Sequence, residues 1–343
     1  MSQESEIFTR KNDHIRINLD EDVRSGLTSG LEHVHLEHCA LPEISLDEID
    51  LSTRFLGYDI KLPFFISSMT GGTKESDRIN IHLAEAAQEM QIPIGLGSQR
   101  VALEKKAESN SFQLRNIAPD IPIFANIGAV QLNYGVGLPD CQKLIELSSA
   151  NALILHLNPL QEALQPEGNI NFHDLLPKID LLCRKLSVPV IIKEVGWGIS
   201  PSVALNLKNA GVSAIDIAGA GGTSWSQVEY YRTANETDRR IAAQFADWGI
   251  PTAKALKDIV SLDLCLPLIA SGGLGSGMDI AKCLALGADL CGLAGKFLNA
   301  GVKSTEAVVE VISELKQELQ ITLFACGAPN LPSLKKVGIS YRE

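Results

Sequence analysis

The chain has 343 residues, of which 45% are hydrophobic and 21% are charged, and its formal net charge is −11 at pH 7. This composition is typical of a globular protein and lacks the low hydrophobicity of a disordered chain. The acidic balance argues against nucleic acid or an anionic membrane as the main partner, so an anionic ligand would need positive charge gathered locally.

Cysteine usage and the N-terminus predict a cytoplasmic protein. The seven cysteines are scattered with no CxxC pair, which does not suggest a disulfide framework. Residues 1–6 are polar and acidic, unlike a signal peptide. No apolar run reaches membrane-spanning length without glycine or charge, so we expect no membrane partner.

Residues 1–60 are predicted to form an N-terminal arm. Arg10 and Lys11 form a basic pair that favours a solvated segment. Val34 and Leu36 alternate with polar residues, which predicts a short hairpin. The histidines at positions 33, 35 and 38 could suggest a metal site, although a surface strand that carries them is the simpler interpretation.

From residue 61 onward, apolar strand-like runs alternate with amphipathic helices. The predicted strands are Leu62–Met69, Ile92–Gly97, Ile121–Asn126, Ala152–Leu157, Val188–Val195, Val212–Ala218, Leu266–Ser271 and Ala288–Ala294. The predicted helices are Glu75–Met90, Lys105–Ile117, Asp140–Ser149, His173–Leu186, Pro201–Ala210, Thr252–Ser261, Met278–Leu286 and Ser304–Gln320.

This alternation indicates an α/β fold, in which helices cover a parallel sheet. Eight units is the number in a (β/α)8 TIM barrel. An open, doubly wound sheet is the alternative, because periodicity does not show closure. The chain 1–343 then reads as one domain, with an arm at 1–60, a barrel at 61–323 and a C-terminal tail at 324–343. An insertion of helical character, Thr223–Ile250, follows strand six.

Polar or glycine-rich residues follow every predicted strand. In a barrel, the carboxyl ends of the strands form the active face. These segments are Ser67–Gly72, Gly97–Arg100, Asn126–Gly128, His156–Glu162, Lys193–Glu194, Gly219–Thr223, Ser271–Gly275 and Leu293–Lys296. Taken alone, residues 156–162 would be an ordinary polar turn with Pro159, and the series makes them part of a predicted site.

The late segments point to a phosphate-bearing ligand. Gly272, Gly273 and Gly275 precede a helix, and glycine turns and helix N-termini both favour anions, although such glycines can also simply make tight turns. A buried Lys193 must be paired or functional, as a Schiff-base nucleophile or as a cation facing a cofactor ring. We expect Glu194 to point outward towards a helix. Glu162 is either an Mg²⁺ ligand or a solvated loop acid.

With these residues placed, the chain resembles the type II, FMN-dependent isopentenyl-diphosphate delta-isomerases over essentially its full length. Seven motifs in order carry the resemblance. They are Arg10-Lys11-x-x-His14, Ser68-Met69-Thr70-Gly71-Gly72, Gly97-Ser98-Gln99-Arg100, Asn126-Ile127-Gly128, His156-Leu157-Asn158-Pro159-Leu160-Gln161-Glu162, Lys193-Glu194-Val195-Gly196, and Gly221-Gly222-Thr223-Ser224-Trp225 with Glu229. One departure lies at 273–277, where family members often carry a charged residue and this chain has none.

The resemblance implies interconversion of isopentenyl and dimethylallyl diphosphate on FMN that NAD(P)H keeps reduced, with Mg²⁺. FMN would be held by Ser68, Met69, Thr70, Ser98, Asn126, Lys193, Thr223, Gly272, Gly273, Leu274, Ala294 and Gly295. The substrate would be held by Arg10, Lys11, Ser98, Gln99, Arg100, His156, Asn158 and Gln161. Glu162 would bind Mg²⁺, and Gln161, Trp225 and Glu229 would be the catalytic residues. A homo-oligomer, a tetramer or an octamer, is also implied.

Two other functions compete with this interpretation. An FMN-dependent 2-hydroxy-acid oxidase would share the barrel, the lysine and the phosphate turns. It would also need a basic histidine and arginines near the late strands, which predicted strands six to eight lack. A flavin-binding scaffold without catalysis would not need Gln161, Glu162 and the basic arm together.

Overall fold

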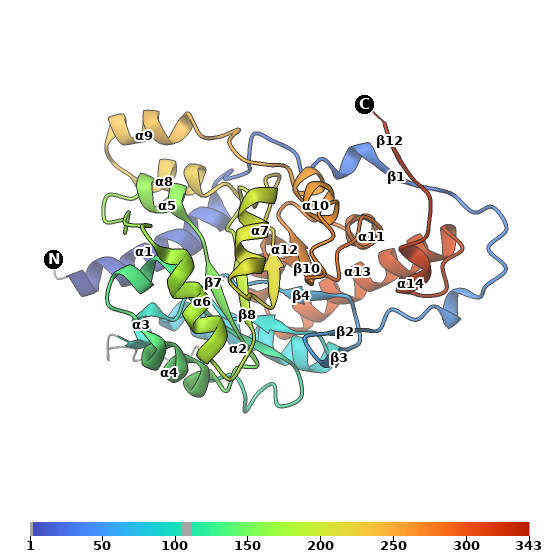
Figure 1. Cartoon of the computed structure of the whole chain (residues 1–343), viewed down its shortest axis with the longest axis horizontal. Helices are drawn as coiled ribbons and strands as arrows, with labels where there is room; N and C mark the ends of the chain where they lie inside the picture. Colours follow the sequence, from blue (N-terminus) through green and yellow to red (C-terminus); the bar gives the residue numbers. More distant parts are fainter. Residues whose placement is uncertain (1–2, 104–111, 343) are drawn as a thin grey trace.

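Eight parallel strands close into a barrel in the computed structural model, which describes residues 3–103 and 112–342 (Figure 1). The strands are β4 (Phe64–Ile66), β5 (Ile94–Gly95), β6 (Ile123–Gly128), β7 (Ala152–His156), β8 (Val190–Lys193), β9 (Ala214–Asp216), β10 (Leu268–Ser271) and β11 (Leu290–Leu293). Strand β11 pairs with β4, which closes the sheet. The predicted TIM barrel is confirmed, and the open sheet is wrong.

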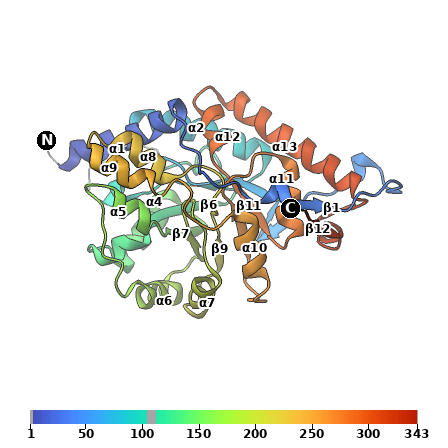
Figure 2. The ribbon, with the colours of Figure 1, turned by 90° about the horizontal axis from the view of Figure 1, so that it is seen from above.

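Helices surround the closed barrel on its outside (Figure 2). Seven predicted helices form, as α2 (Lys74–Met90), α4 (Leu138–Ser148), α6 (Leu175–Lys185), α7 (Pro201–Asn209), α10 (Thr252–Val260), α11 (Gly277–Ala285) and α13 (Thr305–Ala325). The predicted helix 105–117 does not form over 112–117, which makes turns, and its other residues lie outside the described ones. Short helices that were not predicted are η1 (Leu31–His33), η2 (Leu46–Glu48), α3 (Arg100–Leu103), η3 (Ala129–Asn133), α5 (Pro159–Leu164), α12 (Gly295–Gly301) and α14 (Leu331–Leu334).

The prediction of a solvated N-terminal arm is wrong, because residues 3–20 form helix α1 (Gln3–Asp20). Ile17 of this helix is buried against Val23 and Val228, and Trp225 also packs on this cluster. Helix α8 (Trp225–Arg232), which carries Val228, and α9 (Glu236–Ala243) come from the predicted insertion after strand six. The insertion and α1 therefore pack together beside the barrel mouth (Figure 1).

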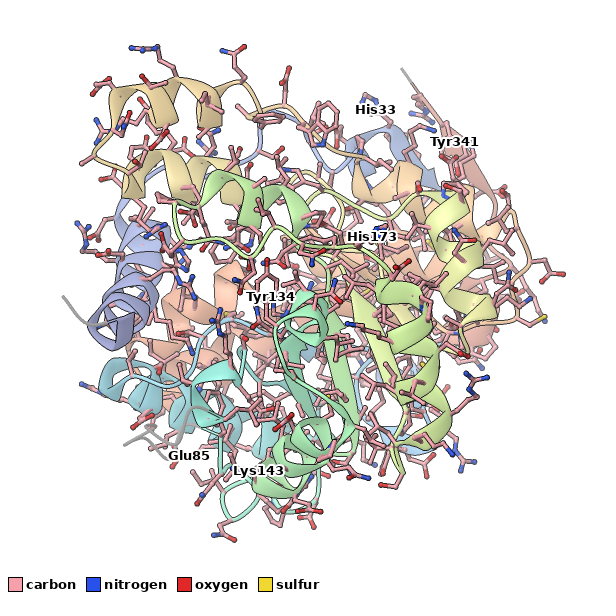
Figure 3. All side chains as sticks on the ribbon, turned by 60° about the vertical axis from the view of Figure 1, so that its left-hand side comes forward. His33, Glu85, Tyr134, Lys143, His173 and Tyr341 are labelled. Atoms are coloured by element: carbon pink, nitrogen blue, oxygen red, sulfur yellow. The ribbon has the colours of Figure 1, made fainter. Side chains whose placement is uncertain are left out.

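Residues 31–60 fold differently from the predicted local hairpin at Val34. Strand β1 (Val34–Leu36) pairs antiparallel with β12 (Ile339–Tyr341), and Figure 3 shows His33 near Tyr341 at the outer edge. A hairpin does form further on, from β2 (Thr53–Phe55) and β3 (Tyr58–Ile60). Among the described residues, no group of three or more metal-ligating side chains is arranged to hold an ion, so the three histidines form no metal site.

Strand alternation divides the barrel interior into two layers. The apolar layer is one cluster of buried side chains, Phe65, Phe124, Ile154, Ile191, Ala214, Ile269 and Leu290, with Phe55 and Ile60 of the hairpin packed against it. Two residues further along each strand, the side chain points inward again. These positions form the polar layer, Ser67, Asn126, His156, Lys193, Asp216, Ser271 and Gly292. Alternation along the strands therefore places the inward-facing polar side chains at the carboxyl end of the barrel only.

Candidate active site

A cavity of about 380 Å³ opens at the carboxyl ends of the barrel strands, above the polar layer. All twelve residues that the resemblance assigns to FMN line it. So do Arg10, Lys11, Ser98, Arg100, His156, Asn158, Gln161, Glu162 and Trp225. Residues from α1, from loops after the strands and from α8 therefore meet at one mouth.

Two predicted site residues do not line the cavity. Gln99 is fully buried, and its Oε1 accepts a hydrogen bond from the Asn126 N–H at 3.0 Å. Its own backbone N–H donates to the Asn126 carbonyl at 2.8 Å, so Gln99 lies behind Asn126 and positions it. Glu229 is 2% exposed and lies behind His14.

The turn after β10 is shaped for a phosphate group. Gly272 has φ +99° and Gly273 has φ +75°, which strain any residue with a side chain. A Cβ on Gly272 would lie 2.0 Å from the Gly219 carbonyl oxygen. The turn leads into α11, where the Ser276 hydroxyl caps the N-terminus by accepting from Asp279 N–H at 3.1 Å. The start of α11 does not line the cavity, and the N–H groups of Gly275 and Gly277 there donate to the carboxylates of Asp279 and Glu318. The glycine turn itself, together with Gly295 at the start of α12 (Gly295–Gly301), which does line the cavity, suits a phosphate.

A second observation supports a polar cofactor. The hydroxyl of Ser68 is buried, lines the cavity and has no hydrogen-bond partner within residues 3–103 and 112–342. Buried hydroxyls are normally bonded, so an unsatisfied one facing a cavity indicates a ligand atom. Together with the glycine turn, the residues present fit FMN.

Lys193 is paired rather than isolated. Its Nζ lies 3.3 Å from Oδ2 of Asp216, the next strand's residue in register. The Ser271 hydroxyl donates to the other carboxylate oxygen of Asp216 at 2.5 Å. This pairing argues against a Schiff-base lysine, which needs a neutral amine, and favours a fixed cation.

The Glu194 side chain does not point outward towards a helix, so the predicted orientation is wrong. One carboxylate oxygen accepts from the backbone N–H groups of Val195, Gly196 and Trp197 at 2.6 to 2.7 Å. Burial raises the pKa of Glu194 to about 7, against the lowering effect of these bonds. The side chain turns back because strand β8 ends at Lys193, and it organises the loop that follows. Val195 and Gly196 of that loop line the cavity.

His156 is neutral at pH 7. Burial, and then the charge of Lys193, lower the pKa of its ring to about 4. Its Nδ1 lies 2.7 Å from Oδ1 of Asn126. Because an amide oxygen only accepts, Nδ1 carries the hydrogen and Nε2 is left as an acceptor.

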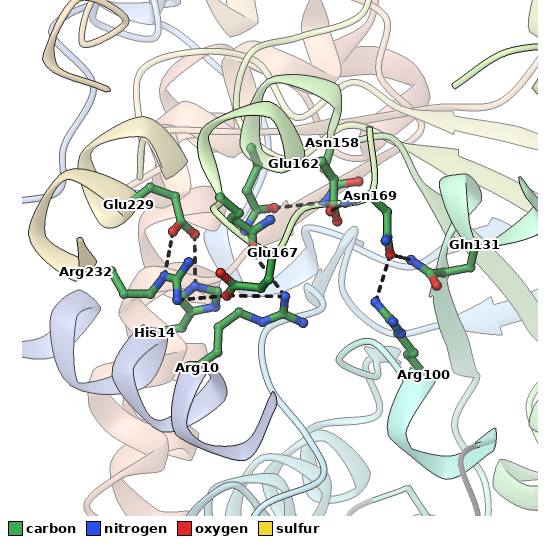
Figure 4. A network of polar contacts seen from close by, with 12 residues as sticks. Arg10, His14, Arg100, Gln131, Asn158, Glu162, Glu167, Asn169, Glu229 and Arg232 are labelled. Carbon is green, nitrogen blue, oxygen red and sulfur yellow. Dashed lines mark hydrogen bonds and ion pairs between the residues drawn. The ribbon is translucent and has the colours of Figure 1, made fainter. Parts of the chain in front are cut away.

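The loop 165–169 holds the arginines at the mouth (Figure 4). Arg10 donates to Gln165 Oε1 at 3.2 Å, and its Nη1 lies 3.9 Å from Glu167 Oε1. Arg100 donates to Asn169 Oδ1 at 2.9 Å. The Lys11 ammonium donates hydrogen bonds to the carbonyl oxygens of Gly71 and Ser98. Sequence reasoning missed this loop, because its polar residues form no motif.

Glu162 lies at the same mouth with one amide oxygen beside it. Its Oε1 accepts from Asn158 Nδ2 at 3.0 Å, and its Oε2 accepts from Asn169 N–H at 2.5 Å. Oδ1 of Asn158 is buried without a partner in the described part of the chain. One carboxylate and one amide oxygen fit Mg²⁺ only if phosphate and water supply the other ligands.

Glu229 reaches the cavity through His14. Oε1 of Glu229 lies 3.1 Å from His14 Nε2, and Oε2 accepts from Arg232 Nε at 2.6 Å. Burial would raise the pKa of Glu229, but His14 and Arg232 outweigh it and hold the pKa below its ordinary value. Burial lowers the pKa of His14, whose ring lies edge-on to Trp225 at 5.0 Å. His14 belongs to the first motif, and the resemblance assigns it no role.

Comparison with known proteins gives consistent matches. The family model of the FMN-dependent dehydrogenases matches residues 20–118 and 162–340. The isopentenyl-diphosphate delta-isomerase of Nostoc sp. is 51% identical over 338 residues, which cover 98% of this chain and 97% of that protein. The isopentenyl-diphosphate delta-isomerase of Rickettsia prowazekii is 52% identical over 332 residues, 97% of each chain.

Solved structures of flavoenzymes share the fold. A mandelate oxidase variant with an FMN adduct superposes with a TM-score of 0.65 at 14% identity, covering 97% of this chain and 93% of that one. A flavocytochrome b2 variant with pyruvate bound gives a TM-score of 0.71 at 16% identity, covering 95% and 82%. Within the described residues, no helix has the length and apolar character needed to cross a membrane.

Proposed function

The chain belongs to the FMN-dependent dehydrogenase family and, within it, to the isopentenyl-diphosphate delta-isomerases, and we propose that it interconverts isopentenyl and dimethylallyl diphosphate with FMN, Mg²⁺ and NAD(P)H. One observation supports the diphosphate most directly. In a protein of net charge −11, Arg10, Lys11 and Arg100 gather at the same cavity mouth as Glu162. Such a concentration of cations beside a carboxylate suits a diphosphate that shares a divalent cation.

The residues divide into those that hold the cofactor and those that hold the substrate. The turn Gly272–Leu274 and the N-terminus of α12 would receive the FMN phosphate, and Lys193 would provide a positive charge to the bound cofactor. Arg10 and Lys11, carried by α1, bind the diphosphate and exclude water from above. Glu162 and the Asn158 amide oxygen would hold Mg²⁺.

The reaction moves a proton from one carbon to another with no net redox change. When bound, reduced FMN would supply the acid and base chemistry for this shift. His156, whose Nε2 is left as an acceptor, would hold the substrate by accepting a hydrogen bond rather than by donating one to a phosphate oxygen. Gln161 orients the allyl unit, and Trp225 walls the site. His14 and Glu229 assist proton handling as a buried pair, with His14 as the member that faces the cavity.

Further parts of the proposal concern the setting of the enzyme. NAD(P)H serves only to keep the flavin reduced. The whole chain acts as one FMN-binding domain in a homo-oligomer, a tetramer or an octamer. All seven cysteines are free thiols, which supports a reducing cytoplasmic environment.

Oxidation of a 2-hydroxy acid is the second candidate function, and it is supported only by the fold that this chain shares with such oxidases. Its reaction would need a histidine base and arginines beside the late strands. The described cavity residues that follow β9, β10 and β11 include neither histidine nor arginine. At 14 to 17% identity, the oxidase structures show the fold alone.

One assay separates the two functions. The purified protein should show a flavin spectrum and, without oxygen and with Mg²⁺ and NADPH, should convert isopentenyl diphosphate into the acid-labile dimethylallyl isomer. Oxygen-dependent turnover of a hydroxy acid instead would favour the oxidase. Lys193→Ala should lose the flavin, and a yellow, fully active variant would contradict the role of Lys193.

A further inference from the structure

We infer that Asp216 is a positioning residue that fixes the ammonium of Lys193 and sets the net charge that the flavin ring meets. The inference rests on the proposed function, because it takes FMN as the ligand of the cavity. The sequence motifs do not include Asp216, and it does not line the cavity.

The geometry places the carboxylate directly behind the lysine. Asp216 is fully buried in β9, in register with Lys193 of β8. The Ser271 hydroxyl occupies Oδ1 at 2.5 Å, whereas Oδ2 faces Lys193 Nζ at 3.3 Å. Within the described residues Oδ2 has no hydrogen-bond donor at normal geometry, so the ion pair alone satisfies it. Strands β8, β9 and β10 thus hold one carboxylate in one orientation.

The pair places one ammonium and one carboxylate in the polar layer. The other members of this layer are Ser67, Asn126, Ser271, Gly292 and His156, and Nδ1 of His156 donates to the Asn126 amide oxygen at 2.7 Å. Lys193 and Ser271 line the cavity, but Asp216 lies below them. A ligand above this layer therefore meets the ammonium first and the carboxylate behind it.

This order of charges matters when the flavin changes its oxidation state. Reduction to the anionic form adds two electrons and one proton, so the ring gains one negative charge. Lys193 stabilises that charge and Asp216 opposes it from a greater depth. The pair, neutral as a whole, moderates the preference for reduced FMN, and removing only the carboxylate leaves an uncompensated cation.

The test is the midpoint potential of bound FMN, measured at pH 7 by anaerobic titration with dithionite against a reference dye. In Asp216→Asn, we expect reduced FMN to be favoured over oxidised FMN about tenfold more than in the wild type. For a two-electron couple this equals a rise of about 30 mV. Asp289→Asn is the matched control. Asp289 forms an ion pair with Lys335 at 2.8 Å, and neither residue lines the cavity. The midpoint potential of FMN bound to this variant should equal that of the wild type.

A second measurement covers variants that bind FMN weakly. Lys193→Met leaves the Asp216 carboxylate uncompensated and should weaken FMN binding in a fluorescence titration. Adding Asp216→Asn restores a neutral pair, so the double variant should bind FMN at least tenfold more tightly than Lys193→Met alone. Near-UV circular dichroism checks that each variant is folded.

The outcomes separate this inference from the proposed function. A wild-type chain that binds no FMN would overturn both. A wild-type chain that binds FMN, with an unchanged or lower potential in Asp216→Asn, would overturn only the role of Asp216. A double variant that binds no better than Lys193→Met would do the same.

Discussion

At its amino end the barrel is filled by Phe65 and Phe124 and covered by Phe55 and Ile60 of the β2–β3 hairpin, whereas at its carboxyl end the same strands present the polar layer to a cavity. A groove of about 540 Å³ also lies at the amino end, beside this hairpin. Its Asp289 and Lys335 bond to each other at 2.8 Å. At the mouth, by contrast, Ser68 and Asn158 keep polar atoms that find no hydrogen-bond partner in the described ranges 3–103 and 112–342. Unsatisfied polarity, rather than cavity size, distinguishes the functional end.

The largest effect is expected at the amino end, on stability alone. Phe124 is 1% exposed, and its ring centroid lies 5.8 Å from that of Phe65. Phe124→Ala should lower the free energy of unfolding by about 3 to 5 kcal/mol, because it leaves a cavity in the apolar layer. Denaturant unfolding of the flavin-free protein measures this. FMN affinity of the folded variant should hardly change, and a parallel loss would show that the two ends are not separate.

Next in size is the loss of the α1 charges at the mouth. Arg10→Ala combined with Lys11→Ala should raise KM for the diphosphate about 100-fold, or about 3 kcal/mol, since both cations line the cavity at the proposed diphosphate site. Steady-state kinetics at saturating Mg²⁺ provide the measurement. Arg16→Ala on the same helix is the control, because that side chain is 64% exposed and, among the described residues, forms an ion pair with Asp13 alone. An unchanged KM would show that Arg10 and Lys11 of α1 do not bind the diphosphate.

A smaller effect concerns pH. The pKa of His156 falls from 6.5 to about 4 in the folded protein, so its contribution to stability is complete above pH 6.5 and is lost as pH falls towards 4. The ring is partly open to the cavity, so we expect a loss of about 2 kcal/mol. Glu194, with its raised pKa, acts in the opposite direction over much of this range.

The informative quantity is therefore the difference between the wild type and His156→Gln, measured by urea unfolding of the flavin-free proteins from pH 7 to pH 4. The wild type should lose stability relative to the variant as pH falls. Parallel curves would mean that His156 is not held neutral by the polar layer.

The smallest effect is expected for the metal. Glu162→Gln should raise the Mg²⁺ concentration needed for half-maximal activity about tenfold, or about 1.4 kcal/mol, because an amide is a weaker ligand than a carboxylate. Glu310→Gln is the control, because Glu310 is exposed on α13 and does not line the cavity. If both variants shift equally, general loss of negative charge explains the result and Glu162 has no special role.

The strands and the polar layer could be predicted because they depend on local patterns. Alternation alone puts Ile154 and His156 on one face of β7, and the apolar cluster and the cavity lie on that face. The packing of α1 could not be predicted in this way, since Ile17 meets Val228 across more than half the chain. The predicted outward orientation of Glu194 is wrong for a different reason. Side chains alternate between the two faces only while the strand continues, and β8 ends at Lys193.

The pairing of β1 with β12 bears on how the molecule assembles. Val34, near the start of the chain, lies opposite Tyr341, near its end. During synthesis, β1 has no partner until almost the whole chain has left the ribosome, and contacts of such wide sequence separation form slowly. Strand β1 therefore takes its final place late, after helix α11, which it contacts, has been synthesised.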